Sequence, residues 1–294
     1  MNNHYLQTII NDSVVEIRAN ELIPGDNEIF INAISKDKSY LLYKTTLTIN
    51  KPRYKSLDYA RLPGKKKQIA LTFDAGSNDG AVDSILAILK KYDVPATAFL
   101  TGIFMKTHPE KVMKLVKSGR FEFGHHTWSH PHLTSYEQNK RHDLLPGVTF
   151  DLLKEEFAKT DSLFYHLSGF HLNPIWRAPY GEYNSQILQW CGHLGFTHIG
   201  WSRGFDTFDW VTDTTSIIYY TPDELWTKWL NRFEEEEHRF KGAIILMHLG
   251  NDRIKPMYSM LHQLIPMMQR RGYQFVTISQ GLEERLLSKT QDIK

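Results

Sequence analysis

From Gln68 onward, the chain alternates between short apolar runs and segments whose apolar residues recur at helical spacing. The apolar runs of strand length are 69–73, 96–100, 243–247 and 275–278. The segments with helical spacing lie at 82–89, 109–118, 225–233 and 257–268. Strands and helices that alternate in this way predict an α/β fold, with a parallel sheet and crossover helices that is either open or closed into a barrel.

Residues 1–53 have a different pattern, in which single apolar residues alternate with polar ones. Val15 and Ile17 flank the charged Glu16, for example, as is typical of a half-exposed strand. We interpret this region as a small β-rich unit, a fragment of an immunoglobulin-like sandwich, because a complete sandwich needs about 100 residues. It is expected to be either a truncated module or a sheet added to the main domain.

The segment 54–66 is polar and basic and contains Pro63 and Gly64, which is typical of a linker. The expected organisation is therefore a β-rich region over 1–53, a linker over 54–66 and an α/β domain over 67–294. A chain of 294 residues is long enough for one large α/β domain with such an attachment.

Composition and charge narrow the class of protein. Hydrophobic residues make up 41% of the chain and charged residues 23%, as in globular proteins, and the net charge of +2 gives no reason to expect nucleic acid as a partner. The single cysteine, Cys191, excludes an internal disulfide and a thiolate metal cluster. No run of about 18 apolar residues predicts a membrane span. Met1–Ile10 lack the basic segment followed by an apolar stretch that is typical of an export signal. The sequence makes no prediction about the oligomeric state.

Polar residues cluster after predicted strands at five points, where parallel strands of an α/β fold gather functional groups. Each cluster taken alone is weak evidence. With 14 histidines in the chain, about one His-x-x-x-His pair is expected by chance. A single aspartate after a strand is more often a helix cap than a catalyst. Five clusters in order, each after a strand, are hard to explain as independent accidents.

In chain order, the clusters are Thr72-Phe73-Asp74-Ala75-Gly76, His126-Thr127-Trp128-Ser129-His130, Arg177-Ala178-Pro179-Tyr180, Asp206-Thr207-Phe208-Asp209-Trp210 and Leu246-Met247-His248. This set resembles the five ordered motifs of the polysaccharide deacetylase (NodB-like) family, over about residues 66–285. The resemblance implies a distorted (β/α) barrel that removes acetyl groups from N-acetylated amino sugars of a glycan. Because that family acts mostly in the cell envelope, it also implies a cell-envelope or secreted protein, with the cytoplasm as the alternative.

By the same resemblance, His126 and His130 bind a divalent metal. Zn²⁺ is expected, although two imidazoles also suit Co²⁺ or Ni²⁺. A spacing of four residues would place both rings on one face of a helical turn. The metal would polarise the acetyl carbonyl and lower the pKa of bound water.

The resemblance also implies the acid and the base of the reaction. Asp74 corresponds to the general base, and Arg177 to the cation that keeps this carboxylate ionised. His248 corresponds to the acid that protonates the leaving nitrogen, and Asp209 to the residue that keeps this histidine protonated. The residues implied in substrate binding are Tyr180, through its backbone amide, and the groove-wall residues Trp210 and Leu246.

One position departs from the family pattern, because Ala75 stands where the family has the aspartate that is its third metal ligand. A methyl group cannot bind a metal ion. Asp79, in the same loop, is one candidate for a substitute ligand, and water is another. If the metal is lost, the alternative function is that of a glycan-binding pseudoenzyme, and an amidase for a non-sugar amide is a further alternative. The retained acid and base favour an active deacetylase.

Overall fold

This computed structural model describes residues 10–11, 14–15, 25–34, 40–49, 58–63 and 66–282. The chain divides into two compact units, Met1–Ser56 and Leu57–Lys294. The first unit contains two antiparallel pairs, formed by β1 (Ile10–Asn11) with β2 (Val14–Val15) and by β3 (Gly25–Ile34) with β4 (Tyr40–Ile49). The immunoglobulin-like assignment of 1–53 depends on the segments between these strands, which lie outside the described residues, and it stays a prediction.

The second unit is built on a sheet of eight strands, all parallel to their neighbours. Across the sheet their order is β11-β6-β7-β8-β9-β10-β5, and β12 also pairs with β6. Every residue of β6 is buried, as expected of a parallel strand covered on both faces. The strands are β5 (Asp58–Tyr59), β6 (Gln68–Ala75), β7 (Ala96–Leu100), β8 (Phe121–His125), β9 (Ile175–Trp176), β10 (Thr197–Ile199), β11 (Ala243–His248) and β12 (Gln274–Phe275).

The residues that follow β10 and β5 close this sheet into a barrel. The amide of Ser202 donates to the carbonyl of Ile244 at 3.0 Å, and Asp206 forms a bridge with Leu246. Arg61 forms a second bridge to the start of β11. Because β5, β9 and β12 have only two residues each, closure depends on irregular segments, and the barrel is distorted. The predicted α/β fold with a distorted (β/α) barrel is confirmed.

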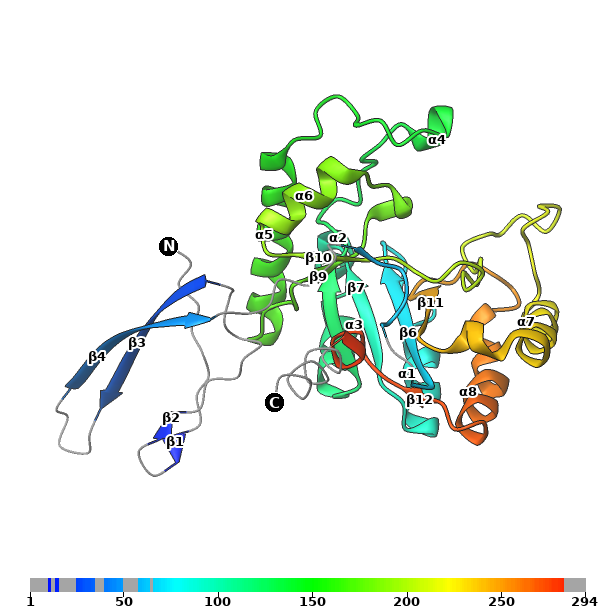
Figure 1. Cartoon of the computed structure of the whole chain (residues 1–294), viewed down its shortest axis with the longest axis horizontal. Helices are drawn as coiled ribbons and strands as arrows, with labels where there is room; N and C mark the ends of the chain where they lie inside the picture. Colours follow the sequence, from blue (N-terminus) through cyan, green and yellow to red (C-terminus); the bar gives the residue numbers. More distant parts are fainter. Residues whose placement is uncertain are drawn as a thin grey trace, which may run out of the picture. The chain divides into compact units, whose positions relative to one another are not determined.

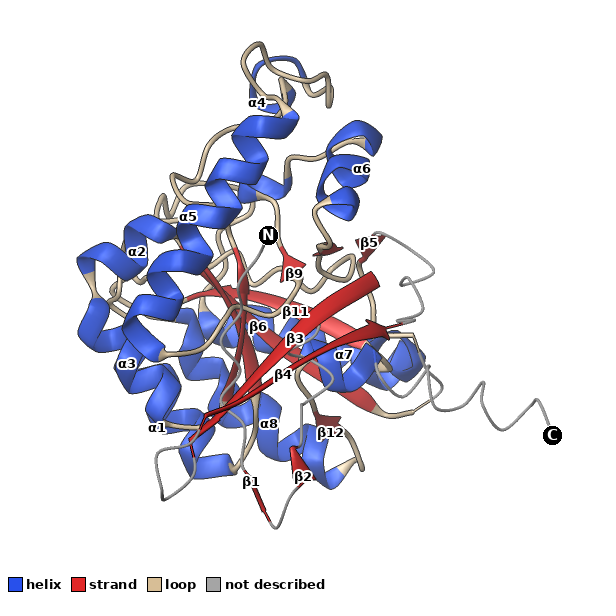
Figure 2. Cartoon of the chain, turned by 90° about the vertical axis from the view of Figure 1, so that its left-hand side faces the viewer, coloured by secondary structure: helices blue, strands red, loops and turns tan. Residues whose placement is uncertain are grey.

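Helices pack around the strands, with α1, α2, α3 and α5 along one side of the sheet (Figure 2). The loop that carries α4 projects from the barrel (Figure 1). Helix α1 buries residues at helical spacing, such as Val82, Ile85, Leu86 and Leu89, against the main apolar core. The helices are α1 (Val82–Tyr92), α2 (Gly102–Thr107), α3 (Pro109–Lys117), α4 (Tyr136–Asn139), α5 (Phe150–Ser168), α6 (Ser185–His193), α7 (Pro222–Glu236) and α8 (Leu261–Arg270), with the 3₁₀ turns η2 (Pro179–Gly181), η3 (Glu237–Phe240) and η4 (Met257–Met260).

The structure corrects two expected boundaries. Part of the expected linker over 54–66 forms β5, because Asp58 accepts hydrogen bonds from His198 Nδ1 at 2.8 Å and from the Tyr183 hydroxyl at 3.0 Å. The strand expected over 275–278 ends at Phe275. There, Thr277 and Gln280 bond to each other's backbone amides at 3.0 and 3.3 Å, and this capping pair starts a helical turn at residue 278.

Candidate active site

Four of the predicted site residues meet at the carboxyl ends of the central strands. Asp74 is the penultimate residue of β6 and His248 is the last residue of β11. The parallel register places these two residues side by side. His126 and Arg177 directly follow β8 and β9, and the amide of Arg177 donates to the carbonyl at the end of β8. The predicted clusters therefore come together because their strands are neighbours in one sheet.

Asp74 and Arg177 form a buried ion pair. Arg177 Nη1 lies 2.8 Å from Asp74 Oδ1, and the two residues are 0% and 4% exposed respectively. The same guanidinium also donates to the Thr72 hydroxyl and to the carbonyls of Ile199 and Gly200, at 2.9–3.0 Å. Burial raises the pKa of Asp74, but the charge of Arg177 and the nearby histidines outweigh it, so the pKa lies below its usual value. Asp74 is therefore an ionised carboxylate in a fixed position.

His248 and Asp209 form the second charged pair. His248 Nδ1 lies 2.7 Å from Asp209 Oδ1, and the backbone amide of His248 donates to Asp209 Oδ2 at 2.7 Å. Burial lowers the pKa of His248, but the charge and hydrogen bond of Asp209 outweigh it and raise this pKa to about 9. His248 is therefore a protonated imidazolium at neutral pH, as an acid requires.

His126 and His130 also meet, although the helical turn expected for them is wrong. Thr127 and His130 have φ angles of 66° and 57°, in the left-handed region, so residues 126–130 form an irregular loop. This loop still brings the two Nε2 atoms to 3.2 Å from each other. Burial lowers the pKa of both rings, that of His130 to about 3. Both imidazoles are therefore neutral, which is the form that binds metals.

The geometry of these two histidines fits a shared metal ion. His126 Nδ1 lies 2.9 Å from the carbonyl of Arg177 and must donate to it, so His126 Nε2 carries the lone pair. Histidine nitrogens bind zinc at about 2.0–2.1 Å, so two nitrogens 3.2 Å apart can reach one ion. Ala75 is fully buried in the main apolar cluster and adds no ligand atom. His126 and His130 would thus hold the metal as two protein ligands.

Asp79 does not join His126 and His130. The only described group of three residues whose ligand atoms converge as a metal site requires is Asp79 with His108 and Glu110. Asp79 Oδ2 lies 3.7 Å from His108 Nδ1 and 3.8 Å from Lys111 Nζ. The interpretation of Asp79 as a substitute third ligand therefore has no support in the geometry, and Asp79 belongs to a different cluster.

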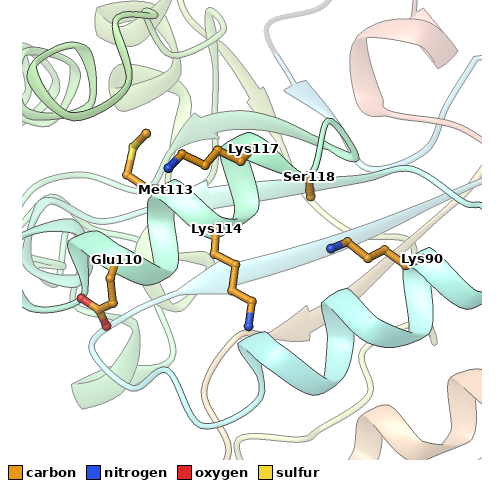
Figure 3. A pocket seen from close by; sticks show the side chains of 6 residues that line it. All are labelled: Lys90, Glu110, Met113, Lys114, Lys117 and Ser118. Atoms are coloured by element: carbon orange, nitrogen blue, oxygen red, sulfur yellow. The ribbon is translucent and has the colours of Figure 1, made fainter.

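A cleft of about 170 Å³ opens over the acid and the base. It is lined by Asp74, Asp209 and His248 and by Trp210, whose side chain is 54% exposed. Leu246, predicted as a wall residue, is only 3% exposed and does not line this cleft. A larger cleft, of about 470 Å³, lies between α1 and α3, and three lysines are among the residues that line it (Figure 3), but it contains none of the residues of the acid–base cluster.

Tyr180 stands beside the pair of His126 and His130. Its φ angle is 57°, an uncommon value for a residue other than glycine and typical of strained positions at functional sites. Its ring stacks on His132, with centroids 3.9 Å apart, and meets the edge of His130 at 4.5 Å. The side chain is 55% exposed, so an aromatic surface borders the candidate metal position.

Sequence reasoning missed Glu156, which holds the loop of His126 and His130 in place. Glu156 lies on α5 and is 7% exposed. Its carboxylate accepts hydrogen bonds from the backbone amides of Trp128 and Ser129 at 2.7 and 2.8 Å, and from the Ser129 hydroxyl at 2.9 Å. These bonds satisfy backbone donors that an irregular loop leaves without helical partners.

Glu156→Ala is expected to destabilise both the fold and the loop formed by residues 126–130. A hydrogen bond to a charged group contributes about 1.5–3 kcal/mol, so the free energy of unfolding should fall by at least that amount in urea titrations. Glu156→Gln, which keeps the acceptor oxygen, should lose less. The matched control is Glu155→Ala, because the Glu155 side chain is 61% exposed. Equal stability of the Glu155 and Glu156 variants would contradict this role.

Three comparisons relate the chain to known proteins. The family profile described as polysaccharide deacetylase matches residues 61–199. A peptidoglycan-N-acetylglucosamine deacetylase of Bacillus cereus is 30% identical over 217 residues, which cover 74% of this chain and 68% of that protein. The peptidoglycan-N-acetylmuramic acid deacetylase PdaA of Bacillus subtilis is 28% identical over 75% of this chain and 73% of its own. The solved peptidoglycan N-acetylglucosamine deacetylase Bc1960 matches with a TM-score of 0.63 and 27% identity, over 78% of this chain and 94% of its own.

These findings agree with the order of the motifs and with the geometry of the site. These relatives are N-deacetylases, which confirms the predicted class of reaction, hydrolysis of an amide bond in an N-acetylated carbohydrate. The structural match confirms the distorted (β/α) barrel as the frame that carries this chemistry. By its motifs, its fold and its relatives, this chain belongs to the polysaccharide deacetylase family.

Proposed function

We propose that this protein removes N-acetyl groups from the amino sugars of peptidoglycan, with Asp74 as the base and His248 as the acid. The observation that carries the proposal is the pairing of each group with its own partner at the mouth of one cleft: Asp74 with Arg177, and His248 with Asp209. Each partner favours the protonation state that hydrolysis of an acetamide requires. A site that only binds sugars needs neither pair, so this observation weighs against a pseudoenzyme.

The base half of the reaction follows from the fixed carboxylate. Asp74 accepts a proton from the water whose oxygen attacks the acetyl carbon. Arg177 keeps Asp74 ionised and bonds to its Oδ1, which leaves Oδ2 to face the water. Asp74 Oδ2 lies 3.7 Å from His126 Nε2, so the base stands next to the candidate metal position.

The acid half follows from the pair of His248 and Asp209. His248 gives its proton to the amide nitrogen while the carbon–nitrogen bond breaks, so that the amine and acetate leave as separate products. Because Nδ1 of His248 donates to Asp209, the proton on Nε2 is the one available to the substrate. The exposed Trp210 would cover the sugar ring with aromatic surface, and the backbone amide of Tyr180 would help to bind the oxyanion.

A divalent metal, with Zn²⁺ as the first candidate and Co²⁺ or Ni²⁺ as others, would be held by His126 and His130. When bound, it would polarise the acetyl carbonyl and lower the pKa of the attacking water. The donor set of two neutral imidazoles is compatible with all three ions. With Ala75 in place of a carboxylate, water would complete the coordination, and we expect weaker metal binding than three protein ligands would give.

Metal removal tests this proposal. Protein stripped with a chelator should lose acetate release from peptidoglycan and from N-acetylglucosamine oligomers by about 100-fold or more, because metal catalysis contributes several kcal/mol. Added Zn²⁺ or Co²⁺ should restore the rate. His130→Gln should prevent this recovery, while His166→Gln, a change at an exposed histidine of α5, should not. Tight metal binding without acetate release would instead favour the pseudoenzyme.

The proposed substrate also suggests where the protein works. Its characterised relatives act on peptidoglycan, and we infer a cell-envelope or secreted location from that. None of the described helices combines the length and apolar character needed to cross a membrane.

Acetate release from peptidoglycan whose N-acetylglucosamine or N-acetylmuramic acid residues are already deacetylated would identify which of the two sugars is the substrate.

A further inference from the structure

Three side chains of the types that bind metals gather where the loop after β6 approaches the junction of α2 and α3. Asp79, His108 and Glu110, here called the loop triad, each offer one ligand atom, and these atoms all lie within 4.8 Å of one another. His108 is the residue between the two helices, and Glu110 is exposed in the first turn of α3 (Figure 3). None of the described residues that line the cleft over Asp74 belongs to the loop triad.

The orientation of His108 is set from outside the triad. His108 Nε2 lies 2.8 Å from the carbonyl of Ser77 and must donate to it. In the neutral ring, Nδ1 therefore carries the lone pair, and it faces Asp79 Oδ2 at 3.7 Å. This distance is too long for a hydrogen bond, which spans about 2.7–3.2 Å. Two acceptors that face each other in this way repel, and a cation between them would remove the repulsion.

The charge of Asp79 is only weakly compensated by its neighbours. Lys111 is the nearest lysine, but its Nζ lies 3.8 Å from Asp79 Oδ2 and 2.7 Å from Asp83 Oδ2. The Lys111 ammonium is therefore engaged mainly by Asp83. Among the described residues, Lys111 is the only lysine or arginine that pairs with the Asp79 carboxylate, and this contact is long.

We propose that the loop triad is a second divalent-metal site, separate from His126 and His130, that binds ions of the Zn²⁺ or Co²⁺ class. One imidazole nitrogen and two carboxylates form a donor set that such ions accept, with water in the remaining positions. Lys111 and the positive N-terminal end of α3 oppose a cation, so the site should be weaker than a structural zinc site with four protein ligands. Because His108 holds Ser77, which lines the active-site cleft, the bound ion would fix residues 76–80 at the rim of the cleft.

Metal stoichiometry tests this proposal without any assay of activity. The full chain is stripped with a chelator and dialysed against Zn²⁺, and bound metal is measured by elemental analysis. We expect two equivalents in the wild-type protein and one in His108→Gln or Glu110→Gln. The double variant with His126→Gln and His130→Gln should also retain one equivalent. His193→Gln is the matched control, since His193 is exposed and its ring bonds to the carbonyl of Gln189 within α6.

The outcomes separate this site from the catalytic one. If the loop triad variants bind as much Zn²⁺ as the wild type, or if the double variant binds none, the second site is overturned. If the wild type binds one equivalent that disappears only in His108→Gln and Glu110→Gln, the loop triad is supported and the centre at His126 and His130 fails. Thermal melting in the absence of metal shows that each variant is folded. The exposed Glu110 can be replaced with little risk to folding.

Discussion

Asp74→Asn is expected to lower kcat/KM for N-acetylated peptidoglycan by about 10²–10⁴-fold, the range that a positioned general base contributes. Asparagine has the same shape as aspartate, so its oxygen can still accept from Arg177, but a neutral amide cannot take the proton of the attacking water. The Asp74 side chain is 6% exposed, so bulk buffer cannot easily replace it. The measurement is acetate release at neutral pH with saturating Zn²⁺.

The control for Asp74→Asn must separate a lost base from a lost fold. The substitution leaves the Arg177 charge buried beside a neutral group, and breaking a buried ion pair destabilises a protein by about 3–5 kcal/mol. The variant is therefore assayed well below its melting temperature, and its Zn²⁺ content is compared with that of the wild type. Asp83→Asn is the matched substitution at a side chain that is 51% exposed. Activity within a few-fold of the wild type in Asp74→Asn would exclude this residue as the base.

The parallel α/β sheet is predictable from local patterns, whereas the barrel and the roles of the acid–base cluster follow from the resemblance of the five ordered motifs to the family. Strand β6 is a continuous apolar run with Asp74 near its end, and β11 is another that ends in His248. Once both strands are parallel neighbours, the register alone places these residues together. Strand β5 is different, because its two residues are held by His198 and Tyr183, which lie 140 and 125 positions away in the chain. No local pattern could show that pairing.

Glu156 and helix α5 show where the apolar pattern fails. The buried face of α5 includes Leu153, Phe157 and Phe164, but also Glu156 and Thr160. These polar residues dilute the helical stripe, so the helix was not predicted. The same spacing could have identified Glu156, since a carboxylate on an otherwise apolar face must find buried donors. Its donors are the amides of the histidine loop, whose left-handed turns no spacing rule predicts.

Asp209→Asn is expected to move the alkaline limit of activity to lower pH. Deacetylation needs His248 in its protonated form, and the pKa of His248 is about 9, so the wild-type rate should fall as the pH rises through about 9. Without the charge of Asp209, only the charges of Asp74 and Asp206 still oppose the effect of burial, so the pKa of His248 should fall from about 9 toward its ordinary value of 6.5. With a pKa of 6.5, about 3% of His248 would stay protonated at pH 8, and we expect kcat at that pH to fall by about 30-fold.

The same pair should also make stability depend on pH. A group whose pKa is higher in the folded state stabilises the fold fully below its unfolded pKa, and this contribution is lost as the pH rises through the folded pKa. For His248 that window runs from 6.5 to about 9, so the melting temperature of the wild type should decline across it. Asp209→Asn should remove this part of the decline, whereas Asp213→Asn, at an exposed aspartate in the same loop, should not. If the activity of Asp209→Asn still declines only near pH 9, a group other than the His248–Asp209 pair determines the alkaline limit of activity.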